Sequence, residues 1–77
     1  MDISQYEIEI RRHALKRAFQ RKISADLIDA ALKSGKVTYF GKNNVKFVKK
    51  YRNFTIICVD HIIGTTIKIV TIEMKGS

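Results

Sequence analysis

The feature that most constrains the fold is a change of hydrophobic period at Gly35. Before this glycine the apolar residues follow the 3.6-residue period of an amphipathic helix, and after it they follow the two-residue period of a strand. Helices followed by strands are typical of an α+β domain, in which helices pack on one face of an antiparallel sheet. We therefore predict two N-terminal helices on a four-stranded antiparallel meander, with residues 1–77 forming a single domain.

The first helix is predicted from about Tyr6 to Arg21. A rotation of about 100° per residue separates an apolar side from a polar side. The apolar side, which we expect to face the core, holds Ala14, Leu15, Ala18 and Phe19. The opposite side holds His13, Arg17, Gln20 and Arg21.

The second helix has a start signal and a stop signal. Ser24 is a favourable N-cap, and Asp26 in the first turn suits the positive end of the helix dipole. Ile23 and Ile28 have the spacing of a hydrophobic staple across the cap. Gly35 is a natural C-terminal stop.

Strands account for the rest of the chain. The predicted ranges are Lys36–Phe40, Val45–Tyr51, Phe54–Asp60 and Thr65–Glu73, with room for a short additional strand near Asp2–Tyr6. Turns are expected at Gly41–Asn44, Arg52–Asn53 and Ile63–Gly64.

Charge gives the first indication of a partner. Fifteen Lys and Arg oppose seven Asp and Glu, for a formal net charge of +8. This surplus favours binding to RNA or another polyanion. The alternative is a well-solvated surface that serves only solubility, because charges of about 2 to 8 are ordinary for a small domain.

Several classes of protein are disfavoured. The single cysteine, Cys58, allows no intrachain disulfide, fits a reducing cytoplasm, and is expected to be a small core residue. No apolar run approaches the length of a membrane span, and the N-terminus does not resemble a signal peptide. No motif predicts a metal or a cofactor.

Asp60 and His61 are expected to lie in a turn at a strand end, without a function.

The most informative segment is a stripe on the first helix. His13, Arg17 and Arg21 are spaced i, i+4 and i+8, so they lie along one helix face. Like charges at this spacing repel each other, which favours a negatively charged partner. An imidazole can act as a general acid or base on a phosphodiester, and guanidinium groups can stabilise the developing charge. A solvated arginine row with a structural histidine is the plainer interpretation.

The same helix carries a resemblance. His13, Ala14, Arg17, Arg21 and Ile23 form the string His-Ala-x-x-Arg-x-x-x-Arg-x-Ile. This string resembles a family of small bacterial and phage domains of unknown function that is grouped with the RelE-like and barnase-like ribonuclease toxins. The segment 70–72 is similar to the end of that family's last strand. Lys22 departs from the family, which has glycine there, and the Arg, Lys and C-terminal Tyr cluster of RelE is absent.

The resemblance implies a RelE-like fold and a metal-independent endoribonuclease of toxin type, with an acidic antitoxin as a potential partner. It implies that His13 is the acid or base and that Arg17 and Arg21 hold the scissile phosphate. Thr71 would line the cleft.

A second set of basic residues could hold flanking phosphates: Arg12, Lys46, Lys49, Lys50 and Arg52, with Lys42 and Lys68 as extensions. The alternative is an edge strand protected from aggregation by lysines. Two other functions stay open. One is a nucleic-acid-binding module without catalysis, and the other is a protein-interaction module whose basic face meets an acidic partner.

Overall fold

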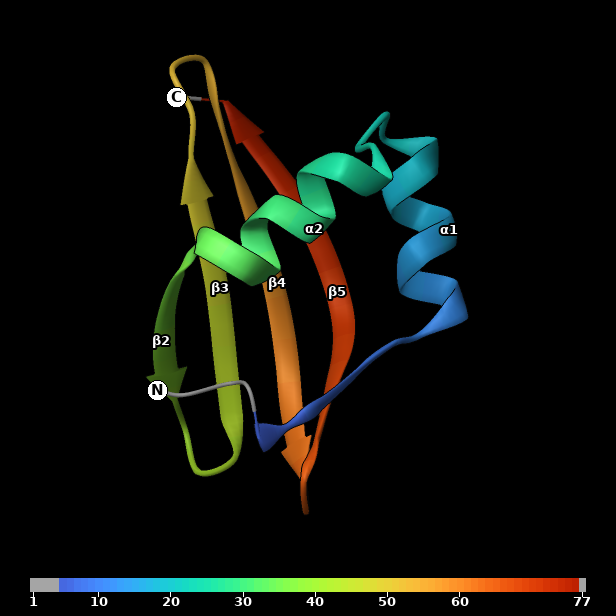
Figure 1. Cartoon of the computed structure of the whole chain (residues 1–77). Helices are drawn as coiled ribbons and strands as arrows, with labels where there is room; N and C mark the ends of the chain where they lie inside the picture. Colours follow the sequence, from blue (N-terminus) through green and yellow to red (C-terminus); the bar gives the residue numbers. More distant parts are fainter. Residues whose placement is uncertain (1–4, 77) are drawn as a thin grey trace.

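The computed structural model describes residues 5–76, in which one mixed sheet carries two helices (Figure 1). In chain order the elements are β1 (Glu7–Ile10), α1 (Arg12–Gln20), α2 (Ala25–Ser34), β2 (Lys36–Phe40), β3 (Asn44–Lys50), β4 (Phe54–Ile63) and β5 (Thr66–Gly76). The strand order across the sheet is β1-β5-β4-β3-β2. The class is therefore α+β.

The predicted sheet of four antiparallel strands after two N-terminal helices is wrong. A fifth strand, β1, precedes both helices and pairs in parallel with β5, from Glu7 opposite Thr66 to Ile10 opposite Ile69. The Glu-Ile-Glu-Ile sequence of β1 alternates with a period of two, but four residues are too few to separate a strand from an adjoining helix. The first helix consequently begins at Arg12.

The expected N-terminal strand near Asp2–Tyr6 falls largely on residues 2–4, which lie outside the described residues. The described strand begins after it, at Glu7.

The meander from β2 to β5 is antiparallel, as predicted. Two strands are longer than expected, since β4 continues to Ile63 and β5 to Gly76. The turn between them contains Gly64 with a positive φ of 59°.

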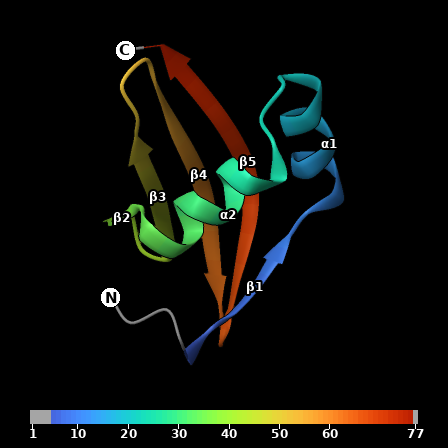
Figure 2. The same ribbon diagram turned by 45° about the horizontal axis from the view of Figure 1, so that its top comes forward.

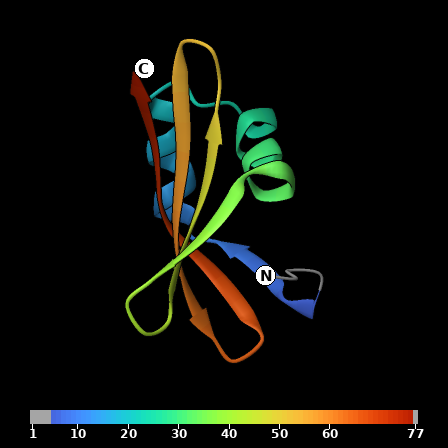
Figure 3. The same ribbon diagram turned by 90° about the vertical axis from the view of Figure 1, so that its left-hand side faces the viewer.

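The core lies between α2 and the sheet. The helix crosses one face of β3 and β4, and Figures 2 and 3 show no helix over the opposite face of these strands. The largest fully buried apolar side chains are Phe47, Ile23, Ile56, Ile67, Ile69, Ile72 and Val45. Cys58 is buried among them, and burial, helped by the charge of Asp60, raises the pKa of its thiol to about 12. The expectation that Cys58 is a core residue is confirmed.

Helix α2 has the predicted boundaries. The hydroxyl of Ser24 accepts a hydrogen bond from the Leu27 amide at 3.3 Å, so the N-cap is confirmed. At the other end, a Cβ on Gly35 would lie 2.3 Å from the Ala31 carbonyl oxygen and 3.1 Å from that of Val48. Glycine is required there because the backbone passes so close to both the helix and β3.

Helix α1 ends in a Schellman motif at a residue that is not glycine. The Ile23 amide donates to the Ala18 carbonyl and the Lys22 amide to the Phe19 carbonyl, at 2.9 and 3.0 Å. Lys22 adopts a left-handed φ of 63°. Ile23 and Ala18 are both fully buried and supply the apolar contact that accompanies this motif.

We predict that Lys22→Gly stabilises the protein by about 1 kcal/mol, because glycine adopts the left-handed conformation without a steric penalty. Urea unfolding of the variant beside Lys16→Gly, a change in the middle of α1, provides the measurement. Lys16→Gly should be destabilising by about 1 kcal/mol. A loss of stability in Lys22→Gly would contradict the prediction.

Candidate active site

Helix α1 lies beside β5 and contacts it through small side chains (Figure 1). Ala14 and Ala18 are buried, with exposed fractions of 3% and 0%, whereas Phe19 is 51% exposed. The predicted core stripe is therefore right for the two alanines and wrong for Phe19. The helix is rotated from its expected orientation so that alanine, the side chain that permits the closest approach, meets the strand.

This rotation brings the polar stripe to the strand instead of turning it away. His13, Arg17 and Arg21 are exposed, and all three border the line of contact between α1 and β5. The stripe was expected opposite the core. It lies instead at the margin of the core, where the backbone of β5 provides the other wall.

A β-bulge shapes that wall. Val59 of β4 pairs with Thr71, and Asp60 pairs with Ile69, so Val70 has no opposite residue in β4. The buried positions of β5 accordingly change from Ile69 to Ile72, a step of three residues instead of two. A bulge bends its strand and redirects side chains, and such features are common next to active sites.

Helix α1 and the bulge of β5 enclose a pocket of about 40 Å³, which we call the α1/β5 pocket. Its lining consists of His13, Ala14, Arg17, Arg21, Val70, Thr71 and Ile72. All four residues predicted as catalytic, which are His13, Arg17, Arg21 and Thr71, thus meet in one place. The volume exceeds the roughly 10–15 Å³ that a single water needs, so it has room for phosphate oxygens and not for a nucleotide.

The charges of the pocket are positive. Two arginines and a histidine line it, and no carboxylate does. The Arg21 guanidinium donates to the Ile72 carbonyl oxygen at 3.3 Å, which holds this side chain over the edge of β5. A guanidinium has five N–H donors, so others remain available for a phosphate.

The predicted flanking residues are not gathered into one strip. Strand alternation separates them, because Lys49 reaches Ser34 of α2 on the helix-bearing side, while the ammonium of Lys46 lies 5.3 Å from the ring centre of Phe40. Lys50 is exposed at the end of β3, and Arg52 lies in the turn to β4. Arg12 is exposed at the start of α1.

The predicted position of Asp60, in a turn at the end of a strand, is wrong. It lies inside β4 and not in a turn, and its exposed fraction is 0%. Among residues 5–76 neither carboxylate oxygen has a hydrogen-bond partner, and burial raises the pKa of the carboxyl to about 8. The alternation Ile56, Cys58, Asp60 was the available signal, since it continues the buried face of β4.

The chain matches no protein-family model, no curated protein and no solved structure to which it was compared. Within the described part of the chain, neither helix is long and apolar enough to cross a membrane. Over the same residues, no group of three or more His, Cys, Asp and Glu side chains is placed to hold a metal ion.

Proposed function

We propose that the α1/β5 pocket cleaves RNA without a metal ion. The observation that carries the proposal is the meeting of an imidazole, two guanidinium groups and a threonine hydroxyl in one pocket that no carboxylate lines. This set matches a phosphodiester in both charge and chemistry. The resemblance of the His13–Ile23 segment to the ribonuclease-toxin families supports the same assignment by analogy.

The reaction needs only groups that RNA, the pocket and solvent water supply. The 2′-oxygen of a ribose attacks the adjacent phosphorus, and two proton transfers accompany the attack: the 2′-hydroxyl loses a proton and the departing 5′-oxygen gains one. His13 carries out one of these transfers, as base or as acid, and water carries out the other. The bond from phosphorus to the 5′-oxygen breaks, leaving a 2′,3′-cyclic phosphate and a 5′-hydroxyl. Arg17 and Arg21 stabilise the added negative charge in the transition state, and Thr71 offers a further hydrogen bond.

The test is incubation of the purified protein with labelled single-stranded RNA in the presence of a metal chelator. We expect cleavage that yields cyclic phosphate ends, and binding whose log–log salt slope changes by about −0.7 for each phosphate neutralised. Salt-dependent binding without cleavage would favour a non-enzymatic nucleic-acid-binding module. Neither binding nor cleavage, with capture of an acidic protein, would favour an interaction module.

A further inference from the structure

A second, larger hollow lies at the far edge of the sheet. Its volume is about 330 Å³, and its lining consists of Ser34, Lys36, Val48, Lys49 and Lys50. We call it the lysine pocket. Three lysines line it, and no acidic residue does.

The lysine pocket arises from the unequal lengths of two strands. The first residue of β2, Lys36, pairs with Val48, so the last two residues of β3 extend past the end of β2. Successive side chains of a strand point to opposite faces. Lys49 therefore faces α2 and Lys50 faces the open side of the sheet, and the hollow at the edge receives positive charge from both faces.

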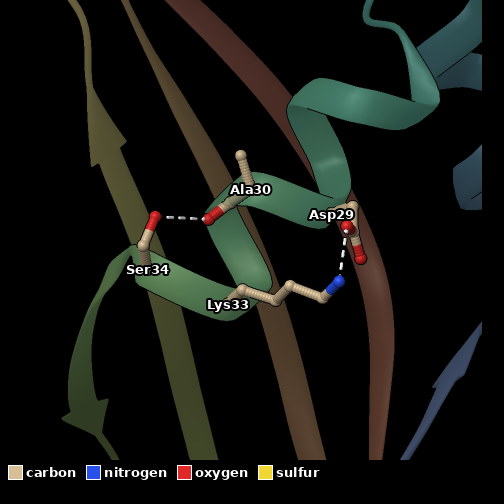
Figure 4. Close-up of polar contacts among 4 residues, drawn as sticks. All are labelled: Asp29, Ala30, Lys33 and Ser34. Carbon is tan, nitrogen blue, oxygen red and sulfur yellow. Dashed lines mark hydrogen bonds and ion pairs between the residues drawn. The ribbon is translucent and has the colours of Figure 1, made fainter.

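Hydrogen bonds hold one of these lysines in place. The Lys49 ammonium donates to the Ser34 hydroxyl at 2.9 Å, and this hydroxyl donates to the Ala30 carbonyl at 2.9 Å. Figure 4 shows the Ser34–Ala30 bond, and beside it the ion pair of Lys33 with Asp29 at 3.0 Å. Lys33, which belongs to α2, is thus paired with a carboxylate. In the described part of the chain, the three lysines of the pocket have no carboxylate partner.

We infer that the lysine pocket binds a backbone phosphate of the same RNA strand whose scissile phosphate occupies the α1/β5 pocket. The inference rests on the proposed function. Pairing links the two sites, because Thr71 is opposite Val59, Val59 is opposite Lys46, and Lys50 is four residues further along β3. At about 4.8 Å between strands and 3.3 Å per residue, this is roughly 16 Å, which a few nucleotides of an extended strand can span.

The surface between the two sites suits a nucleic acid better than an acidic protein. It is the sheet face that no described helix covers, and the register places the partly exposed Ile57 midway between Thr71 and Lys50. Lys46 lies on the same face opposite Val59, and Glu73 opposite Ile57 is the carboxylate that the register places beside the path. Lysine binds phosphate as a point charge and needs no fixed geometry from its ligand. A hollow of about 330 Å³ has room for a phosphate and its ribose.

The test compares Lys36→Gln/Lys50→Gln with the control Lys16→Gln/Lys33→Gln, which removes the same charge at two exposed positions outside both pockets. We expect the first variant to raise KM for a decaribonucleotide by about tenfold with kcat unchanged, and to flatten the salt slope by about 0.7 for each phosphate that is no longer neutralised. Cleavage of a diribonucleotide, which is too short to reach the lysine pocket, should be unaffected. The control should match the wild type on both substrates.

Equilibrium binding of the decaribonucleotide, followed by fluorescence anisotropy, separates this inference from the cleavage proposal. If the wild type cleaves no RNA, cleavage is excluded, yet a selective decrease in the affinity of Lys36→Gln/Lys50→Gln still supports a phosphate site. Equal decreases in both double variants would overturn it. Equally tight binding of poly-glutamate, abolished in the same variant, would also overturn it and assign the surface to an acidic protein.

Discussion

Replacing Asp60 with valine should raise the free energy of unfolding by as much as about 4 kcal/mol at pH 7, because each unit of pKa shift corresponds to about 1.4 kcal/mol. The carboxyl is fully buried, and neither oxygen has a partner among the described residues. Burial raises its pKa from 3.8 to about 8 in the native state. At neutral pH, unfolding therefore releases a proton that the native protein retains.

The sign of the pH dependence follows from this shift. The stability that the protonated Asp60 carboxyl contributes is fully present below its ordinary pKa of 3.8 and is lost as the pH rises from there through about 8. Urea unfolding at pH 5, 7 and 9 should show this decline in the wild type and a nearly flat profile in Asp60→Val. Asp29→Asn, a change at an exposed carboxylate, should keep the decline of the wild type. A wild type whose stability does not fall between pH 5 and 9 would contradict the account.

Replacing His13 with alanine should lower the rate of RNA cleavage by about 10²-fold or more, the usual contribution of a general acid or base. The side chain is exposed at the margin of the α1/β5 contact, so its removal should leave the fold intact. Arg17→Ala should lower both cleavage and RNA affinity, because the guanidinium binds the phosphate before and during the reaction.

His61 provides the matched control for His13. It is the other histidine of the chain, it is exposed on β4, and it pairs with Lys68 of β5 away from the pocket. His61→Ala should cleave RNA at the wild-type rate. Equally slow cleavage by the two alanine variants, or undiminished cleavage by folded His13→Ala, would remove His13 from the site.

Local signals in the sequence were sufficient to order the elements after Arg12, although β4 and β5 extend past their predicted ends. The Ser24 cap, the Gly35 stop and the alternation in β3 each depend on neighbours along the chain, and the structure confirms them. Strand β1 was missed because its pairing with β5 joins residues about sixty positions apart, which no local period reveals.

The sequence predicted which residues form the candidate site, but it did not predict which face of α1 packs on the sheet. The spacing of His13, Arg17 and Arg21 placed them on one face of α1, but Phe19 was wrongly assigned to the core. Tertiary packing selected the alanine face because β5 passes close to the helix at the bulge. The sequence shows that the isoleucines of β5 change their spacing from two residues to three between Ile69 and Ile72. Only the pairing with β4 shows that this change is a β-bulge.

The central claim is that the α1/β5 pocket cleaves RNA through the 2′-hydroxyl of the RNA itself, without a metal ion. The most direct measurement compares a labelled RNA with the same RNA carrying a 2′-deoxyribose at one cleaved linkage, both incubated with the wild-type protein and a chelator. We predict that this linkage alone becomes resistant, while cleavage at the other linkages continues at an unchanged rate. Cleavage that persists at the deoxyribose linkage, or that stops throughout when the chelator is added, would contradict the account.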